Sequence, residues 1–205
     1  TPKPSSAASD VYKRQKHIMT SKYKILITGA AGFLGSHLVE KLHSLGHTVI
    51  GIDNMMGGYE DNVIKGTEFH KLDCCDLPKI QEVMKGVDVV YHCAATAHEG
   101  LSVFSPYEIT KNNYLASVSI FTAAINNKVK RIVYCSSMAR YGDSKTPFTE
   151  DMEPKPIDPY AISKVASEKV LANLCEINNV EYVIAVPHNI IGPRQRYDDP
   201  FRNVV

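Results

Sequence analysis

One short stretch constrains the fold of this chain more than any other. Residues 28–35, TGAAGFLG, join two runs of opposite character. Residues 23–28 (YKILIT) are apolar and rich in β-branched side chains, which is typical of a buried strand. Residues 33–46 place apolar side chains at helical spacing and end at a glycine. The stretch therefore predicts a strand, a tight turn and a helix in direct succession.

The same alternation of apolar and amphipathic runs continues along the chain. The spacing predicts further strands at 47–53, 67–73, 87–95, 130–137 and 180–187, and further helices at 76–86, 106–127 and 158–179. Asp76 and Pro78 are typical of the first turn of the helix that begins there. Apolar strands that alternate with helices favour a Rossmann-type α/β fold, a doubly wound parallel sheet with helices on both faces.

Composition and charge narrow the class of protein. The chain has 205 residues and a formal net charge of +1, with no basic run, so we expect no nucleic-acid partner. No apolar stretch approaches the ~20 residues of a membrane span, so we expect no membrane insertion. The five cysteines lack zinc-ligand spacing and most lie in apolar runs, so we expect no metal site and a reduced, cytoplasmic protein.

The first residues do not share the pattern of the rest. Residues 1–18 are polar and lack the apolar core of a secretory signal. We expect a disordered or non-native leader there, with Met19 as the natural start. Residues 19–190 are expected to form one domain.

The glycine spacing in TGAAGFLG predicts a dinucleotide site. Gly29, Gly32 and Gly35 would allow a tight turn, and Phe33 and Leu34 open the helix whose free N–H groups face a pyrophosphate. An ordinary strand–helix turn is the alternative for such a glycine trio alone. Here the trio follows a strand, opens a helix and is completed by an acid, which favours the dinucleotide.

That acid is Asp53, at the end of the second predicted strand. Its carboxylate can accept hydrogen bonds from the adenosine ribose, and its charge would repel a 2′-phosphate. Residues 54–62, which start with Asn54, contain no Arg or Lys to bind such a phosphate. NAD is therefore favoured over NADP.

Other residues that follow strands are candidates for the rest of the cofactor. Asp73, with Cys74 beside it, could contact the adenine amine, although a polar residue flanking a helix is nearly as good an interpretation. Ala94 and Ala95 are small side chains at a place where the backbone must pass close to the cofactor.

A tyrosine and a lysine lie four residues apart at the start of a predicted helix, hence on one face. Tyrosine is a poor base at neutral pH, but a neighbouring ammonium and a positive nicotinamide would favour the phenolate of Tyr160. Tyr160 could then exchange a proton with a substrate hydroxyl, while Lys164 also holds the nicotinamide ribose. Ser137, at the end of the fifth strand, would fix the substrate oxygen, with Ser136 as its neighbour. Such a pair alone is common on helix surfaces, but the glycine turn and the serine favour catalysis.

Together these motifs resemble one family. From Lys24 to about Gln195 the chain is similar to the extended short-chain dehydrogenase/reductases, the NAD-dependent epimerase/dehydratase family. The segments that carry the resemblance are TGAAGFLG, HCAA, CSSMARYG, PYAISK and PHNIIGPRQ. The resemblance implies Ser137, Tyr160 and Lys164 as catalytic residues.

The resemblance implies further residues and partners. It implies Asn113 and Pro187 at the cofactor and Asn189 at a nucleotide-sugar substrate, although capping of a helix or turn is the alternative for both asparagines. It also implies a homodimer in the full-length protein. Residues 191–205 would then begin a substrate-binding lobe that is mostly missing from this chain.

The resemblance also narrows the reaction. The family's 4,6-dehydratases carry an Asp-Glu pair after the catalytic hydroxyl, and its UDP-glucuronate decarboxylases carry a glutamate at the position of Ala139. Met138 and Ala139 can neither donate nor accept a proton, which favours a UDP-hexose 4-epimerase that oxidises C4 and returns the hydride to the other face. A nucleotide-sugar reductase or dehydrogenase using NAD(P), and a non-catalytic NAD or nucleotide-sugar binder, remain alternatives.

The resemblance leaves two features without an assigned role. Arg140 stands where the family leads us to expect an apolar residue. In the loop after the fourth strand, His98, Glu99 and Ser102 could touch sugar hydroxyls, although solvated loop residues are the alternative for each.

Overall fold

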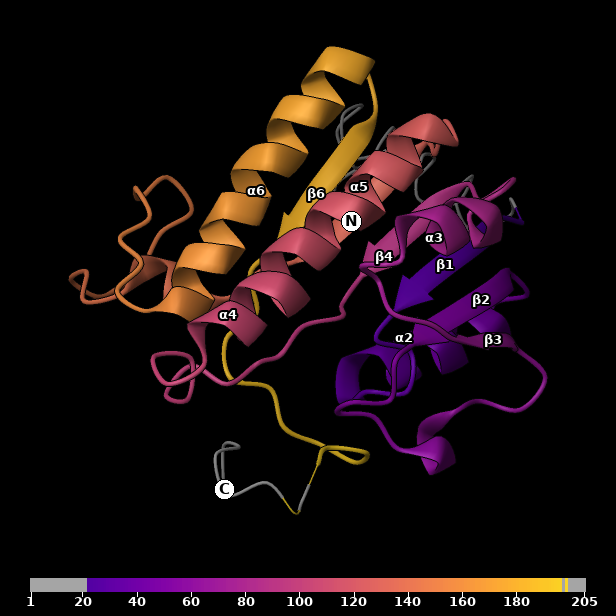
Figure 1. Cartoon of the computed structure of the whole chain (residues 1–205), viewed down its shortest axis with the longest axis horizontal. Coiled ribbons are helices and arrows are strands. Elements are labelled where there is room, and N and C mark those ends of the chain that lie inside the picture. The colour runs from indigo at the N-terminus through magenta and orange to yellow at the C-terminus, as the bar shows by residue number, and fades with distance from the viewer. Residues whose placement is uncertain (1–21, 197, 199–205) are drawn as a thin grey trace, which may run out of the picture.

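The computed structural model describes residues 22–196 and 198, which form a six-stranded parallel sheet with helices on both faces (Figure 1). The predicted doubly wound Rossmann-type fold is confirmed. The expected leader, residues 1–18, lies outside the described residues. The strands are β1 (Lys24–Thr28), β2 (Thr48–Asp53), β3 (Glu68–Lys71), β4 (Val89–His92), β5 (Arg131–Cys135) and β6 (Glu181–Ala185), in the spatial order β3-β2-β1-β4-β5-β6.

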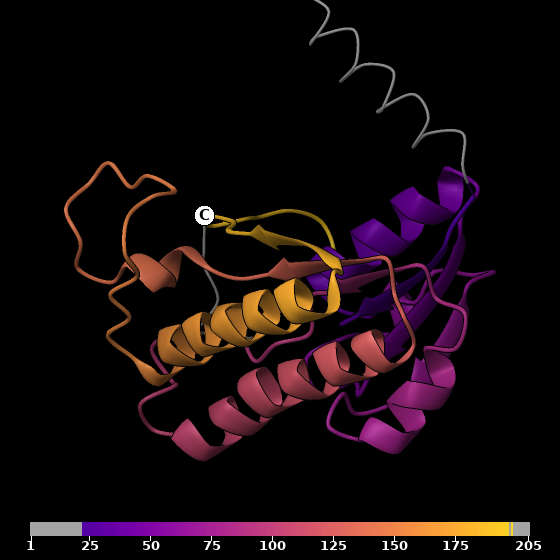
Figure 2. The same ribbon diagram turned by 90° about the horizontal axis from the view of Figure 1, so that it is seen from above.

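Helices cover the sheet unequally on its two faces. They are α2 (Phe33–Ser44), α3 (Leu77–Val83), α4 (Pro106–Ile109), α5 (Ala116–Asn126) and α6 (Pro159–Asn178). Figure 2 shows α2 on one face and α3, α5 and α6 on the other. Along β1, Leu26 belongs to the core on the α5 side, whereas Ile25 and Ile27 belong to the core on the α2 side. Both faces of this strand are buried, as its unbroken apolar run predicts.

The helix ends follow local chemistry, with one difference from expectation. Asp76 caps α3 as predicted, since its side chain accepts a hydrogen bond from the backbone N–H of Lys79. Asp158 caps α6 in the same way, through the N–H of Ala161. The apolar spacing predicts a helix over 33–46, but α2 ends at Ser44, and Leu45 beyond it is 49% exposed.

The helix predicted over 106–127 is not a single α-helix. A π-helical segment, η2 (Thr110–Leu115), separates α4 from α5. The Asn113 carbonyl of this segment accepts a hydrogen bond from the hydroxyl of Ser117 in α5 at 2.5 Å, and the Asn113 side chain bonds the backbone of Thr96. Such segments often occur at functional sites. Apolar periodicity cannot reveal this one, because it depends on contacts with a loop outside the helix.

The topology points to the place where a ligand binds. The chain moves outward from β1 to β3 and then returns to the other side of β1 to form β4. Loops that follow β1 and β4 therefore leave in opposite directions and open a crevice at the carboxyl ends of the strands. Two short 3₁₀ turns flank it, η1 (Glu60–Asn62) and η3 (Met138–Tyr141).

Candidate active site

A cleft of about 730 Å³ opens at this switch point, beyond the carboxyl ends of β1, β4 and β5. It collects every residue predicted for catalysis, NAD or the nucleotide sugar except Asn113, and of the loop residues predicted near sugar hydroxyls it includes His98 and Glu99 but not Ser102. The predicted residues that line it are Gly29, Gly32, Phe33, Leu34, Gly35, Asp53, Asn54, Asp73, Cys74, Ala94, Ala95, Ser137, Tyr160, Lys164, Pro187 and Asn189.

In the glycine turn, Gly29 and Gly35 lie so close to neighbouring backbone that neither position has room for a side chain. Gly29 has φ +70°, and a Cβ there would lie 3.0 Å from the backbone of Ala94 on the neighbouring strand end. A Cβ on Gly35 would lie 2.0 Å from the carbonyl oxygen of Gly29, because α2 starts directly against the turn. The result is an open cradle of backbone at the N-terminus of α2, where N–H groups favour an anion.

Asp53 joins this turn to the loop after β2. Its carboxylate accepts hydrogen bonds from the backbone N–H of Ala31 at 3.0 Å and of Met55 at 2.8 Å. Asp53 is 8% exposed and lines the cleft. A carboxylate offers about four lone-pair sites, so two remain for a ligand.

The neighbouring loops complete this end of the cleft. The Asp73 carboxylate accepts a hydrogen bond from the N–H of Cys75 at 2.8 Å, and the Asn54 side chain accepts one from the N–H of Met56 at 3.0 Å. Burial raises the pKa of the Cys74 thiol well above its usual range. Cys74 therefore contributes an apolar surface here rather than a thiolate.

A buried histidine at the end of β4 orders the loop beside the glycine turn. The Thr28 hydroxyl oxygen accepts N–H bonds from Cys93 at 3.1 Å and from Ala94 at 2.9 Å. Its own proton is then directed at Nδ1 of His92, 2.7 Å away, and we infer that the imidazole proton sits on Nε2. Burial, with a smaller contribution from the charge of Lys164, lowers the pKa of His92 to about 3. The ring is therefore neutral.

The same network continues from His92 to Asn113. Nε2 of His92 lies 2.9 Å from the Ser117 hydroxyl, which donates to the Asn113 carbonyl. The Asn113 side chain accepts the N–H of Thr96 at 2.7 Å and donates to the Ser163 hydroxyl at 3.3 Å. Asn113 is 1% exposed and lies behind the cleft wall, where it holds the loop after β4. Its predicted contact with the cofactor stays a prediction.

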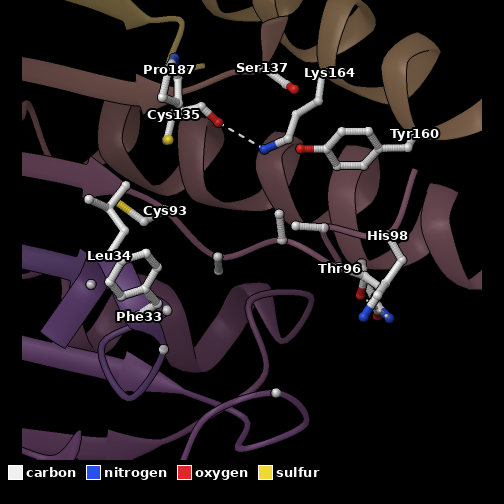
Figure 3. Close-up of a pocket in the computed structure, with 18 of the residues that line it drawn as sticks. Phe33, Leu34, Cys93, Thr96, His98, Cys135, Ser137, Tyr160, Lys164 and Pro187 are labelled. Atoms are coloured by element: carbon white, nitrogen blue, oxygen red, sulfur yellow. Dashed lines mark hydrogen bonds between the residues drawn. The ribbon is translucent and has the colours of Figure 1, made fainter. Parts of the chain in front are cut away.

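The tyrosine and lysine of α6 face the end of β5. Tyr160 is 8% exposed and Lys164 3%. The Lys164 ammonium donates to the carbonyl of Cys135 at 2.8 Å and lies 5.8 Å from the centre of the Tyr160 ring (Figure 3). Burial by itself disfavours the charge, but the surrounding Tyr134, Tyr160 and cysteine side chains outweigh it, and the pKa of Lys164 is raised. Lys164 is therefore a cation at neutral pH.

The two serines after β5 have different surroundings. Ser137 lines the cleft, and its hydroxyl oxygen accepts the N–H of Ala139 at 3.1 Å. Figure 3 shows the Ser137 hydroxyl and the Tyr160 phenol on the same wall of the cleft. Ser136 is 3% exposed, and its hydroxyl bonds the carboxylate of Glu168 on α6.

The loop after β4 supplies part of the facing wall. His98 and Glu99 line the cleft, and burial together with nearby Asp158 raises the pKa of Glu99. Ser102 fits neither expectation for it, because it is 0% exposed. Its hydroxyl bonds the carbonyl of Glu99 at 2.6 Å and the Asp158 carboxylate at 3.2 Å. Ser102 therefore shapes the loop.

Sequence reasoning assigned no role to Arg194, although it singled out the segment PHNIIGPRQ that contains this residue. Residues 192–196 run past the cleft, which Arg194 lines, and the Arg194 guanidinium bonds Glu40 on α2 at 2.9 Å. The two residues are 154 positions apart in the chain, so no local signal links them.

The fold and the cleft together indicate the class of protein to which this chain belongs. A Rossmann domain with a glycine turn, an acid at the end of its second strand and a Tyr–Lys pair near a strand-end serine is the arrangement expected of an enzyme that transfers hydride with a dinucleotide. A sequence profile described as the NAD dependent epimerase/dehydratase family matches residues 25–204. The chain belongs to this family.

Individual relatives agree with that assignment. The chain is 31% identical to the UDP-glucose 4-epimerase of Lactobacillus helveticus, over 82% of this chain and 52% of that protein. Among solved structures, the Thermus thermophilus UDP-glucose 4-epimerase complex with NAD has a TM-score of 0.81 at 32% identity, and the match covers 84% of this chain and 57% of that one. The Thermotoga maritima UDP-glucose 4-epimerase with UDP-glucose has a TM-score of 0.82 at 31% identity, covering 84% and 58%.

The matched proteins are longer than this chain, and their names span several reactions. The chain spans a little over half the length of the three relatives above. Other matches are a UDP-N-acetyl-alpha-D-glucosaminuronate decarboxylase and a dTDP-glucose 4,6-dehydratase, so the family covers several reactions on nucleotide sugars.

NAD is the cofactor of this family, and the cleft fits it. The absence of a side chain at Gly29 and Gly35 lets α2 start directly against the turn, so the free backbone N–H groups at its N-terminus lie at the cleft, where a pyrophosphate can bind them. Within residues 22–196 and 198, no three His, Cys, Asp or Glu side chains gather as a metal ion would require. Among the helices of the same residues, none has the length and apolar character needed to cross a bilayer.

Proposed function

We propose that the protein is an NAD-dependent nucleotide-sugar epimerase of the UDP-hexose 4-epimerase type. The observation that carries the proposal is the pair of side chains next to the strand-end hydroxyl. Met138 and Ala139 line the cleft directly after Ser137, and neither can transfer a proton. Elimination of water and decarboxylation need further acid–base groups, whereas inversion of one alcohol centre needs only the pair formed by Tyr160 and Ser137 together with NAD as the reversible hydride acceptor.

The residues of this chain divide the chemistry among them. The phenol oxygen of Tyr160 takes the proton of the sugar C4 hydroxyl and later gives it back. The buried ammonium of Lys164 favours the phenolate that this transfer needs. The Ser137 hydroxyl bonds the same sugar oxygen and holds it in place. When NAD is bound, it supplies reversible acceptance of the hydride from C4.

Binding of the cofactor is assigned to the opposite side of the cleft. Gly29, Gly32 and Gly35 cradle the pyrophosphate, with Phe33 and Leu34 at the start of α2. The two unused lone-pair sites of the Asp53 carboxylate accept the adenosine ribose hydroxyls. The remaining contacts assigned to NAD are those of Asn54, Asp73, Cys74, Ala94, Ala95, Asn113, Tyr160, Lys164 and Pro187.

The proposal extends to the substrate and to assembly. Asn189 contacts the nucleotide sugar, residues 19–190 form the NAD-binding domain, and residues 191–205 begin the substrate lobe. A homodimer in the full-length protein is supported by apolar side chains left open on neighbouring helices. Tyr107 is 76% exposed, Leu115 49% and Ile162 53%. The cytoplasmic location stays a prediction.

The test is to incubate the protein, at the full length of its gene, with UDP-glucose, UDP-GlcNAc and their C4 epimers, without added cofactor. Interconversion with retained NAD supports the epimerase. Turnover only with added NADH or NADPH would replace it with a reductase, and loss of water or CO₂ would replace it with a dehydratase or decarboxylase. Binding without turnover would leave a non-catalytic binder.

A variant tests the assigned base. Tyr160→Phe removes one oxygen atom and keeps the ring, so we expect turnover to disappear while NAD stays bound. Cofactor content after purification and product formation by chromatography report the two properties separately. Full residual activity would refute the role of Tyr160.

A further inference from the structure

Arg140, the residue that the family resemblance does not explain, is turned away from the cleft and toward α6. Its guanidinium Nη2 lies 3.1 Å from Oε2 of Glu168. The side chains of Arg140 and Glu168 are only 16% and 6% exposed. This is a buried ion pair, whose members cannot be replaced singly without leaving an uncompensated charge.

Glu168 connects this pair to the catalytic turn. Its other carboxylate oxygen, Oε1, accepts a hydrogen bond from the Ser136 hydroxyl, and Ser136 precedes Ser137 in the chain. Glu168 follows Lys164 by four residues and Tyr160 by eight, so all three lie on one face of α6. Lys164 holds the Cys135 carbonyl and Glu168 holds the Ser136 side chain. Helix α6 thus holds the two residues that lead into Ser137.

Arg140 is itself fixed to a third segment. Its carbonyl accepts the N–H of Lys155 at 2.8 Å, and its guanidinium lies 5.2 Å from the centre of the Tyr141 ring. Its Nε is buried and has no hydrogen-bond partner within residues 22–196 and 198. The guanidinium is therefore buried with one N–H group unpaired, and its charge is balanced in this position by the carboxylate of Glu168.

We propose that Arg140 is a positioning residue that acts through Glu168 and Ser136 to hold the hydroxyl of Ser137 toward Tyr160. This inference rests on the proposed epimerase function. Arg140 pairs with Oε2 of Glu168, while Oε1 of the same carboxylate accepts the hydrogen bond from the Ser136 hydroxyl, so the ion pair fixes the group that holds Ser136. Because Glu168 fixes the side chain of Ser136, the next residue, Ser137, is held in one orientation. Arg140 is not among the residues that line the cleft, so its role would be exerted through Glu168 and Ser136.

A double-variant cycle tests this coupling in the epimerase assay. Arg140→Met and Glu168→Gln are each expected to lower kcat about tenfold with little change in KM, because each leaves a buried charge unpaired. The combination of both is expected to return kcat to within about threefold of the wild type, since the amide oxygen of the introduced glutamine still accepts from Ser136 and no buried charge remains. Effects that multiply in the double variant would overturn the proposal, as would an unchanged kcat in Arg140→Met.

A matched control separates this pair from ion pairs in general. Arg131 at the start of β5 pairs with Glu181 at 2.8 Å, but their side chains are 41% and 68% exposed. Arg131→Met should leave kcat unchanged, because exposed pairs contribute little. A loss equal to that in Arg140→Met would overturn the proposal. If Arg140→Met does not fold, Glu168→Gln provides the single variant, and Arg140→Lys, which keeps a positive charge opposite Glu168, should retain kcat within about threefold of the wild type.

A second readout distinguishes failure of this inference from failure of the proposed function. If the wild type epimerises no nucleotide sugar, the proposed function is wrong, and the positioning role for that reaction falls with it. If the wild type is active and the double variant recovers thermal stability but not kcat, the ion pair is only structural. That outcome would overturn the positioning role and leave the epimerase standing.

Discussion

Acidification should destabilise this protein through a single buried histidine, His92. The ordinary pKa of the side chain is 6.5, and in the folded protein burial and the charge of Lys164 lower it to about 3. The hydrogen bonds give an independent reason. Thr28 directs its hydroxyl proton at Nδ1 of His92, since its oxygen already accepts two backbone N–H groups. A second proton on the ring, at Nδ1, would point at the Thr28 hydroxyl, whose oxygen has no lone pair left to accept it.

The sign and size of the effect follow from proton binding. Between about pH 3 and 6.5 the unfolded chain binds a proton at His92 that the folded chain does not, so the free energy of unfolding falls as the pH falls. From about pH 7.5 to about pH 5 the loss is about 2 kcal/mol, since each pH unit below the unfolded value contributes about 1.4 kcal/mol. This loss of about 2 kcal/mol depends little on the pKa of His92 in the folded protein, because that pKa lies well below the range from about pH 5 to about pH 7.5.

The assay is urea unfolding of the wild type and of His92→Gln at several pH values across that range. Glutamine cannot be protonated, so the variant should be less stable at neutral pH and lose about 2 kcal/mol less on acidification. His43→Gln, at an exposed position on α2, is the matched control and should give a curve parallel to that of the wild type. Parallel curves for the wild type and His92→Gln would refute the reasoning.

Two further predictions concern the glycine turn and an ion pair at the other end of the sheet. Gly35→Ala forces a Cβ to 2.0 Å from the carbonyl oxygen of Gly29, so it should lower the free energy of unfolding by about 1–3 kcal/mol and remove most of the NAD that the protein retains on purification. Gly57→Ala is the control: its Cβ would have no atom within 4 Å, so the free energy of urea unfolding should hardly change. Hydrogen bonds to Lys130 and to the N–H of Lys24 lower the pKa of Asp88 below its ordinary 3.8. The stability that this shift contributes is present above 3.8 and lost as the pH falls through the lower folded value. Asp88→Asn should therefore lose less unfolding free energy than the wild type below about pH 4, and an identical acid curve would contradict this.

The part of the site that was predictable from sequence is the part that directly follows strands. Gly29 directly follows β1, Asp53 ends β2, and Ser137 lies two residues beyond the end of β5. In a parallel sheet the carboxyl ends of neighbouring strands meet, so residues at strand ends could be assigned to one cleft without knowing their contacts. Tyr160 and Lys164 could be added because their spacing of four places both on one helix face.

The residues that sequence reasoning missed or misplaced depend on partners far away in the chain. From the sequence, His92 was only the first residue of the HCAA segment. The structure shows it at the centre of a hydrogen-bond network that runs from Thr28 to Asn113. Ser102 read as a loop residue at the substrate, and the structure shows it buried. Neither the neutrality of a histidine nor the burial of a serine is a local property, because both depend on which groups surround the side chain.

The sequence by itself determined the order of strands and helices, the glycine cradle and the kinds of side chain that reach the cleft. These depend on apolar periodicity and on backbone geometry within a few residues. Only the tertiary structure decided that Asn113 lies behind the cleft wall and that Arg140 pairs with Glu168 instead of facing the substrate. The reason is physical: the free energy of a buried charge or amide depends on desolvation and on a partner, and here those partners lie far apart in the chain.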